Sequence, residues 1–228
     1  ASDVYKRQTM EWAIKMSDNV LDISKERIAT ELKKILSADV RYPSLNNEYA
    51  HYRGLKLLDE TTVLTKLFPV LKEGKGVRQN PKYHDYDVFE HIMQTVKFAP
   101  PSVRLAALFH DVAKPMCLAR DGNMYNHPQE SARIARELLG AKGLKLSNAE
   151  VEKICRLIEN HMYNLSNETK TPKLRWFLAK NHDIAYDLIS LIRADAMAAK
   201  GVKSPSADRM EQLFFEMTQS GTPMLSLI

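Results

Sequence analysis

The chain has 228 residues, of which 44% are hydrophobic and 27% charged, and its formal net charge of +5 is too mild to indicate a nucleic-acid partner. No run approaches the roughly 18 apolar residues that a membrane span needs, and the only two cysteines, Cys117 and Cys155, lack the spacing of a zinc site or a disulfide framework. These features give no sign of a membrane span and disfavour a disulfide-rich secreted protein, and they predict a cytoplasmic protein with reduced thiols and no membrane partner.

The two ends of the chain back-translate to one DNA segment read in opposite directions. Ser2–Gln8 (Ser-Asp-Val-Tyr-Lys-Arg-Gln) corresponds to TCAGATGTGTATAAGAGACAG, and the reverse complement of its last twelve bases encodes Leu225–Ile228 (Leu-Ser-Leu-Ile). The segment is similar to a transposase adapter used for sequencing libraries, and the alternative is coincidence over four codons. Residues 1–8 and 225–228 are therefore predicted to be translated adapter, and the rest a piece of a longer gene product.

Between these ends, helical periodicity dominates and no stretch shows convincing strand alternation. In chain order, the predicted helices span about 24–37, 47–59, 61–72, 86–98, 101–113, 129–140, 148–162, 172–181, 184–199 and 207–219. The Gly- and charge-rich segment Lys72–Pro81 is the best boundary. The sequence thus predicts an all-α fold, with a helical region at 9–72, a linker at 73–79 and a helical domain at 80–224.

Several predicted helix ends have chemical support. Ser147-Asn-Ala-Glu150 is a capping box, and Asp183 and Ser206 are N-cap candidates. Glycine is common just past the last turn of a helix, and three glycines have this position: Gly140, Gly143 and Gly201.

The run Leu-Ala-Ala-Leu-Phe-His-Asp-Val-Ala-Lys-Pro, residues 105–115, places His110 and Asp111 at the inner end of an apolar helix. Pro115 predicts that this helix stops soon after Lys114. For an isolated pair, the usual explanation is a hydrogen-bonded core histidine beside a capping carboxylate. Other residues in the chain favour a different explanation for this pair, as metal ligands.

Four more metal-ligand residue types lie on or beside apolar helices, namely His91, His127, His161 and Asp195. Asp195 interrupts an apolar helix and needs a partner, because burial of an unpaired carboxylate is very costly. Imidazoles with carboxylates are ligands of Mn, Fe, Co, Ni or Zn, with Mg less typical. One or more divalent metal ions would satisfy the whole set.

The order of these residues resembles the HD superfamily of metal-dependent phosphohydrolases, which are all-α bundles whose ligands come from separate helices. Six positions agree in order: His91, His110, Asp111, His127, His161 and Asp195. The resemblance implies that His91, His110, Asp111 and Asp195 hold a first metal ion. It also implies a second ion held by His127 and His161, to which Asp111 could bridge.

The same resemblance implies that Asp111 and Lys114 are catalytic. Lys114 stands at the family's lysine position, where it would meet a substrate phosphate or orient the carboxylate, and Ala113 stands where the family commonly has glycine. Metal-bound water would supply a hydroxide nucleophile, so no serine or cysteine is needed. The implied substrates are phosphomonoesters or 2′,3′-cyclic phosphates of nucleotides or RNA ends.

Four further titratable residues lie outside the set of six candidate ligands. His84 and Arg104 are candidates for substrate binding, against the alternatives of a turn anchor for the histidine and a solvated face for the arginine. His51 and His182 belong to no constellation and are predicted to lie at the surface.

A second resemblance covers most of the chain. Glu26–Ile28 with Glu31–Leu36, Leu57–Pro69 and Tyr83–His91 are similar to the carboxyl-terminal half of bacterial tRNA nucleotidyltransferases of the CCA-adding and poly(A) polymerase family. In that family a nucleotidyltransferase head precedes a helical RNA-binding neck, and many members carry an HD domain after it. The resemblance implies that 9–72 end the neck, that 80–224 form an HD domain, and that the parent protein binds tRNA or an RNA 3′ end.

The head itself is not found in the sequence. Nucleotidyl transfer in that family needs a Gly-Ser loop and an Asp-x-Asp pair on a strand, whereas Asp85-Tyr-Asp87 has neither context and opens the His91 helix as a cap. We expect no nucleotide addition by this chain alone. Two alternatives stay open: a stand-alone HD nucleotide phosphohydrolase, which would not explain the match over 22–69, and a non-catalytic module that supports tRNA.

Overall fold

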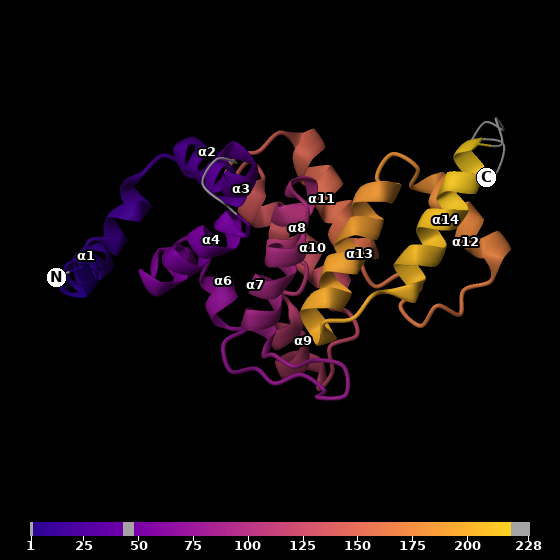
Figure 1. The fold of residues 1–228 in the computed structure, drawn as a ribbon, viewed down its shortest axis with the longest axis horizontal. Coiled ribbons are helices and arrows are strands. Elements are labelled where there is room, and N and C mark those ends of the chain that lie inside the picture. Colours follow the sequence, from indigo (N-terminus) through magenta and orange to yellow (C-terminus); the bar gives the residue numbers. More distant parts are fainter. Residues whose placement is uncertain (1, 43–47, 220–228) are drawn as a thin grey trace.

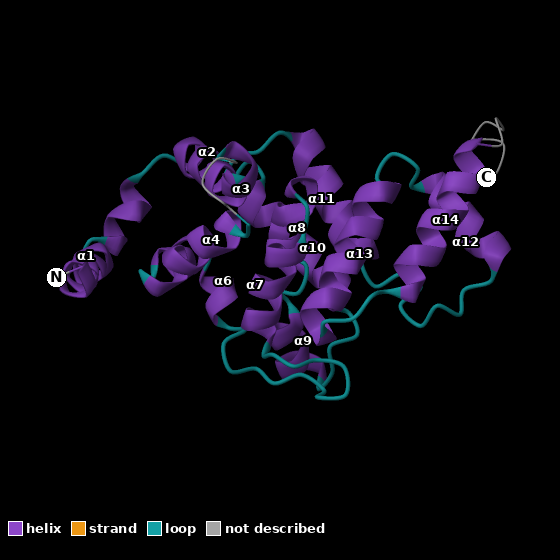
Figure 2. Cartoon of the chain, in the orientation of Figure 1, coloured by secondary structure: helices purple, strands orange, loops and turns teal. Residues whose placement is uncertain are grey.

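The computed structural model describes residues 2–42 and 48–219, with the backbone alone for residues 2–5. Every regular element in these ranges is a helix, so the predicted all-α class is confirmed (Figures 1 and 2). The elements are α1 (Ser2–Lys15), η1 (Ser17–Asp22), α2 (Lys25–Leu36), α3 (Ala38–Arg41), α4 (Ala50–Glu60), α5 (Val63–Leu67), α6 (Pro69–Lys72), α7 (Val88–Phe98), η3 (Pro101–Val103), α8 (Arg104–Phe109), α9 (Lys114–Asp121), α10 (His127–Leu139), α11 (Asn148–Asn160), α12 (Thr171–Lys180), α13 (Ala185–Lys200) and α14 (Pro205–Gln219).

A central bundle of α7, α8, α10, α11 and α13 forms the middle of the molecule, with α1 and α14 toward opposite ends (Figure 1). Within it, α13 packs on α7 and α10 packs on α11. Burial follows the helical period, as in Val88, Ile92 and Val96 of α7. None of the described helices is both long and apolar enough to cross a bilayer.

The apolar core continues across the predicted boundary at 73–79. Phe68, just before α6, packs edge-to-face on Phe109 of α8, with ring centroids 5.1 Å apart. The boundary segment turns back onto α7, where the amide of Phe89 donates to the carbonyl of Gly74, and a Cβ at Gly74 would lie only 3.1 Å from that amide nitrogen. These contacts fix the turn, although the division of the chain into 9–72 and 80–224 stays a prediction.

Arg104 has a structural role instead of the predicted contact with substrate. Its guanidinium donates to both carboxylate oxygens of Asp39, at 2.6 and 2.7 Å, and to the carbonyls of Leu36 and Ala99. These bonds lower the pKa of Asp39 against the effect of burial. The stabilisation that these bonds give the folded protein is therefore fully present above the ordinary pKa of an aspartate. It is lost as the pH falls through the lowered pKa of Asp39. Arg104 joins the N-terminal helices to the bundle.

The prediction that His51 lies at the surface is wrong, whereas His182 is exposed as predicted. His51 Nε2 lies 3.1 and 3.0 Å from the carbonyls of Val96 and Lys97, at the end of α7. Its other ring nitrogen faces Asp39 at 3.5 Å. The histidine is buried because α4 packs on the last turn of α7, a contact between segments about 45 residues apart.

Two predicted helices are divided in the structure. The helix at 61–72 breaks at Phe68 into α5 and α6, because Pro69 fits a first turn and cannot continue an earlier helix. The helix at 101–113 ends at Phe109, and Pro115 lies in the first turn of the following helix, α9. Besides α9, the sequence reasoning missed α1, η1 and α3.

The capping predictions are confirmed in part. Asp87 accepts from the amide of Glu90, and Ser147 forms the complete capping box. Ser204 takes the place predicted for Ser206 as the cap of α14, since it accepts from the amide of Ala207 at 3.1 Å. Asp183 instead pairs with Arg156, and α13 begins without a side-chain cap.

We predict that Arg104→Met lowers the free energy of unfolding by about 2–4 kcal/mol, because it leaves Asp39 and two carbonyls without their donor. Urea denaturation at pH 7 would measure the change. Arg120→Met is the matched control, since Arg120 pairs with Asp121 and Glu130 at the surface, and it should leave stability almost unchanged. Equal effects of the two substitutions would contradict the structural role of Arg104.

The adapter prediction concerns residues 1–8 and 225–228, of which the second segment lies outside the described residues. Lys6, Arg7 and Gln8 are exposed on α1, whose main packing partner is η1. Deletion of residues 1–8 should therefore leave the melting temperature within experimental error. A marked fall in melting temperature on this deletion would argue that the segment belongs to the folded protein.

Candidate metal centre

The structure brings the six predicted ligand residues together from five places in the bundle. His91 lies on α7, His110 and Asp111 follow α8, His127 begins α10, His161 follows α11 and Asp195 lies on α13. The four histidines and Asp111 are buried, and Asp195 is partly exposed. The site therefore exists only when the whole bundle is assembled.

Asp111 occupies the middle of this cluster. Its Oδ2 lies 3.3 Å from Nε2 of His91 and 3.3 Å from Nε2 of His110. Its Oδ1 lies 3.0 Å from Nε2 of His127 and 3.5 Å from Nε2 of His161. Each carboxylate oxygen thus faces a different pair of imidazoles.

Asp195 adds a second carboxylate to the His91 and His110 side. Its Oδ1 lies 2.8 Å from Nε2 of His91 and 3.7 Å from Nε2 of His110. The Nε2 atoms of His91 and His110 are themselves 3.3 Å apart, as are those of His127 and His161. Nitrogen and oxygen atoms of these side chains therefore converge on two neighbouring points.

Helix ends and turns set the orientation of three of the imidazoles. In each case Nδ1 lies 2.6 to 2.7 Å from the main-chain carbonyl three residues earlier: Ala107 for His110, Met124 for His127 and Ile158 for His161. A carbonyl oxygen can only accept, so Nδ1 carries the proton and Nε2 of a neutral ring presents a lone pair. At the ends of α8 and α11, these bonds also satisfy carbonyls of the last helical turn.

The Nε2 lone pairs face one another and the two carboxylates. This arrangement needs positive charge to offset the repulsion between them. Burial lowers the pKa of His110, but Asp111 and Asp195 outweigh it and raise this pKa to about 10. Burial likewise opposes ionisation of the two carboxyls, yet the adjacent cationic groups hold both pKa values well below the usual range. A single proton on His110 relieves only some of these contacts, whereas a divalent cation would relieve each group that it binds.

The side chains fit a divalent metal ion by their chemistry as well as their position. Among the described residues, two groups have ligand atoms close enough to share an ion: His91, His110 and Asp195, and His110, Asp111 and His161. His127 adjoins the second group through Asp111 and His161. Imidazole and carboxylate ligands suit first-row divalent ions such as Mn, Fe, Co, Ni and Zn.

Lys114 lies directly beside the cluster. Its Nζ is 2.7 Å from Oδ2 of Asp111 and donates to Oε1 of Gln79 at 2.8 Å. Because an ammonium group has three donors, a third remains after these two contacts. Sequence reasoning missed Gln79, which lies in the predicted linker and carries no motif. Ala113 is buried, and its amide donates to Ser131 Oγ.

A pocket of about 470 Å³ opens beside the cluster and has Lys114, Asp195 and His84 in its lining. The His84 ring lies edge-on to His91, with centroids 4.9 Å apart, and its Nδ1 has no hydrogen-bond partner among the described residues. Burial and the Lys114 charge lower the pKa of His84 to about 4. The structure thus brings His84 to the pocket beside the predicted ligands.

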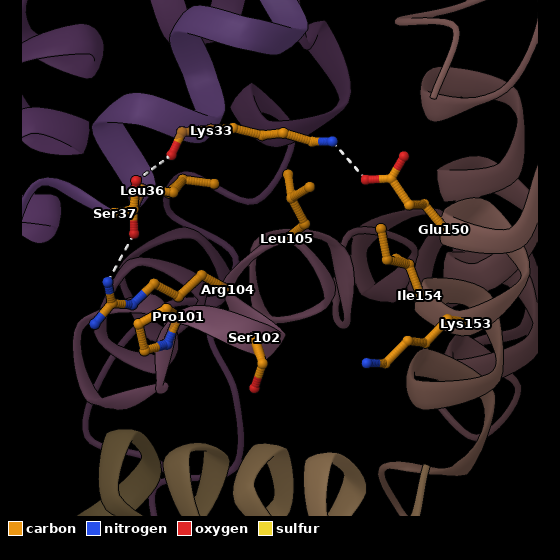
Figure 3. A pocket seen from close by; sticks show the side chains of 10 residues that line it. All are labelled: Lys33, Leu36, Ser37, Pro101, Ser102, Arg104, Leu105, Glu150, Lys153 and Ile154. Atoms are coloured by element: carbon orange, nitrogen blue, oxygen red, sulfur yellow. Dashed lines mark hydrogen bonds and ion pairs between the residues drawn. The ribbon is translucent and has the colours of Figure 1, made fainter. Parts of the chain in front are cut away.

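A separate pocket of about 410 Å³ lies between α2, α8 and α11, away from the cluster (Figure 3). Its three cations already have acidic partners: Lys33 pairs with Glu150, Lys153 with Asp187 and Arg104 with Asp39. No group of potential metal ligands among the described residues lies there. The 470 Å³ pocket is therefore the better candidate for a substrate site.

An all-α bundle in which four buried histidines and two aspartates converge from separate segments defines the class of this protein, and comparison with known families agrees. The family model described as HD domain matches residues 86–200, a range that contains all six candidate ligands. The chain belongs to the HD domain family. A second model, described as "Probable RNA and SrmB- binding site of polymerase A", matches residues 6–75.

Two curated relatives extend the comparison. The A-adding tRNA nucleotidyltransferase of Deinococcus radiodurans is 32% identical over 169 residues, which cover 69% of this chain and 38% of that protein. The CC-adding tRNA nucleotidyltransferase of Thermus thermophilus is 32% identical over 192 residues, which cover 79% of this chain and 41% of that protein. The chain thus spans about two fifths of their length, and both predicted resemblances are confirmed.

We predict that Mn²⁺, Co²⁺ or Ni²⁺ stabilises the protein. An ion at a concentration of about 100 times its dissociation constant adds about 2.7 kcal/mol to the free energy of unfolding. For a chain of this size, that raises the melting temperature by about 5–10 °C. Differential scanning fluorimetry with each metal, and with a chelator, would measure the shift. Asp195→Asn should reduce it and Asp187→Asn, on the same helix but outside the cluster, should not. An equal shift in both variants would contradict metal binding by this cluster.

Proposed function

We propose that this chain is the HD-type phosphohydrolase module of a tRNA nucleotidyltransferase-like protein, and that it hydrolyses phosphomonoesters or 2′,3′-cyclic phosphates. The observation that carries the proposal is the position of Asp111, whose two oxygens face two separate pairs of imidazoles. A carboxylate in this position is suited to bridge two cations. Membership of the HD domain family supports the same conclusion.

In this proposal His91, His110, Asp111 and Asp195 would hold the first ion, and His127, His161 and Asp111 would hold the second. When bound, the ions would supply a water-derived nucleophile at neutral pH and neutralise charge on the phosphoryl oxygens. The carbonyls that fix His110, His127 and His161 keep the Nε2 lone pairs of these rings turned toward the cluster, where they would be available to the ions.

Lys114 handles the substrate. Two of its donors are engaged by Asp111 and Gln79, and the third is available to a phosphoryl oxygen that enters through the adjacent pocket. His84 is assigned to substrate binding because its side chain lines the same pocket. Arg104 is not included, because its guanidinium is committed to Asp39 and two carbonyls.

We propose tRNA or another RNA 3′ end as the partner of the parent protein. The match of residues 6–75 to an RNA-binding family and the names of the two relatives support this partner. They also favour a tRNA-associated module over a stand-alone HD nucleotidase. Both cysteines are free and buried, which agrees with a cytoplasmic location.

A non-catalytic role is the second candidate function. The core shared by the N-terminal helices and the bundle, together with the pair between Arg104 and Asp39, forms a firm connection that a tRNA-supporting module would need. In that case the metal ions would be structural and the chain would turn over no phosphoester.

The deciding experiment measures metal content by elemental analysis and hydrolysis of a 2′,3′-cyclic nucleotide on the same samples. Asp111→Ala should abolish both, because it removes the shared ligand. Lys114→Met should keep the metal and lower kcat/KM by roughly 10- to 100-fold, the effect of losing one hydrogen bond to a charged group. Asp121→Ala, which removes a carboxylate from the surface of α9, is the control for both measurements.

Retention of full metal content and rate by Asp111→Ala would overturn the assignment of the site. Metal binding by the unaltered protein, without turnover of phosphomonoesters or cyclic phosphates, would contradict the hydrolase and support the non-catalytic function.

A further inference from the structure

The connecting loop, residues 73–87, runs from α6 to α7 along the lower edge of the bundle (Figure 1). Its first half is held on the beginning of α7. The amide of Gly76 donates to Oδ2 of Asp87 at 2.7 Å, and the amide of Val88 donates to the carbonyl of Val77 at 3.0 Å. Gly76 has a φ of +77°, a backbone conformation that favours glycine because it lacks a Cβ. This part of the loop therefore has a defined path.

The rest of the connecting loop is tied to two further elements. The amide of Asp85 donates to the carbonyl of Ala199 in α13, and the carboxylate of Asp85 pairs with Lys200 of the same helix. On the side of the N-terminal helices, Lys75 pairs with Asp59 of α4 at 2.6 Å. The loop is thus attached both to the bundle and to the N-terminal helices.

Gln79 directs its side-chain amide to both the connecting loop and the metal-ligand cluster. Its Nε2 donates to the carbonyl of Tyr86 at 3.4 Å, and its Oε1 accepts from Nζ of Lys114 at 2.8 Å. Because a carbonyl can only accept and an ammonium can only donate, these two partners fix which end of the amide faces Lys114. The loop thereby brings one neutral acceptor to a lysine 35 residues away.

The direction of the Lys114 ammonium depends on this acceptor. The side chain of Lys114 is 8% exposed, and its Nζ lies 2.7 Å from Oδ2 of Asp111. The stem of a lysine is flexible, so the hydrogen-bond partners of the ammonium set its direction. Asp111 is also a predicted metal ligand, and a bound cation would draw on the same carboxylate. Gln79 is the partner of Lys114 that lies outside the predicted ligand set.

We propose that Gln79 is a positioning residue for Lys114. Its amide oxygen holds the ammonium between the cluster and the 470 Å³ pocket, so that the third donor of Lys114 stays directed toward a phosphoryl oxygen. Gln79 is not among the residues that line this pocket, and it acts on the ligand through Lys114 alone. The inference rests on the proposed function, in which Lys114 contacts the phosphate of the substrate.

Binding of inorganic phosphate to the metal-loaded chain, measured by isothermal titration calorimetry, tests this role without relying on turnover. Gln79→Met removes the acceptor and should raise the dissociation constant about 3- to 10-fold, the effect of one hydrogen bond of ordinary strength. Gln79→Glu, of nearly the same shape, should raise it at least as much, because a carboxylate would compensate the charge of Lys114. Gln212→Met, the same change at an exposed glutamine of α14, is the matched control and should leave the constant unchanged.

A double-mutant cycle with Lys114→Met tests whether Gln79 acts through Lys114. In the Lys114→Met background, Gln79→Met should change the dissociation constant by less than about 2-fold, because the donor that it positions is gone. An equal fold-change in both backgrounds would overturn the inference. Intact phosphate binding in Gln79→Met and Gln79→Glu would also overturn it, as would the absence of phosphate binding by the unaltered metal-loaded chain.

Metal content, measured by elemental analysis on the same samples, separates positioning of Lys114 from damage to the cluster. Gln79→Met should retain the metal of the unaltered protein, since Gln79 is not a predicted ligand. A loss of metal in parallel with the loss of phosphate binding would overturn the assignment to Lys114.

Turnover of a phosphomonoester distinguishes this inference from the proposed function. Gln79→Met should raise KM and leave kcat almost unchanged, as expected when an interaction with the bound phosphate is weakened equally in the ground state and the transition state. Coupling in the phosphate cycle without turnover of any phosphoester would contradict the hydrolase and still support the positioning role. Turnover with an unchanged KM in Gln79→Met would support the hydrolase and overturn the positioning role.

Discussion

The burial of the Asp111 carboxylate is the constraint on which the rest of this structure depends. Its side chain is 1% exposed, and a buried carboxylate is tolerated only beside compensating positive charge or donors. Lys114 supplies one contact from the next helical turn, and the other groups around Asp111 are imidazoles from α7, α10 and the ends of α8 and α11. The bundle must therefore bring several segments to one point, and the same convergence creates a set of metal ligands.

Helix ends do much of the positioning. A side chain in the middle of a helix is about 100° from its neighbour in sequence, so adjacent ligands cannot face one point there. His110 and Asp111 follow the last turn of α8, where the chain leaves the helix. The carbonyl of Ala107 then accepts a hydrogen bond from Nδ1 of His110 and holds its ring. The carbonyl of Ile158 holds the ring of His161 in the same way. Termination of the helix thus supplies both the change of direction and the hydrogen bond that orients the ligand.

The sequence predicted the parts of the site that have a local chemical signal. Asp195 was recognisable because it interrupts an apolar helix, and the capping role of Asp87 was recognisable from its place before α7. Gln79 and the buried position of His51 depend on partners 35 to 46 residues away, for which no pattern in the local sequence exists. Pro115 was misjudged for a different reason, since a proline that ends one helix is equally suited to begin the next.

The helix that presents His110 and Asp111 also joins the two regions of the chain. Arg104 begins α8 and binds Asp39 of α3, and Phe109 ends α8 and contacts Phe68. A displacement of the N-terminal helices would therefore act on both ends of this six-residue helix, directly before the ligand pair. Because packed cores transmit strain and deform little, the position of the N-terminal region and the geometry of Asp111 are mechanically linked. In the proposed function, RNA held by the N-terminal region would thereby be kept in a fixed relation to the metal centre.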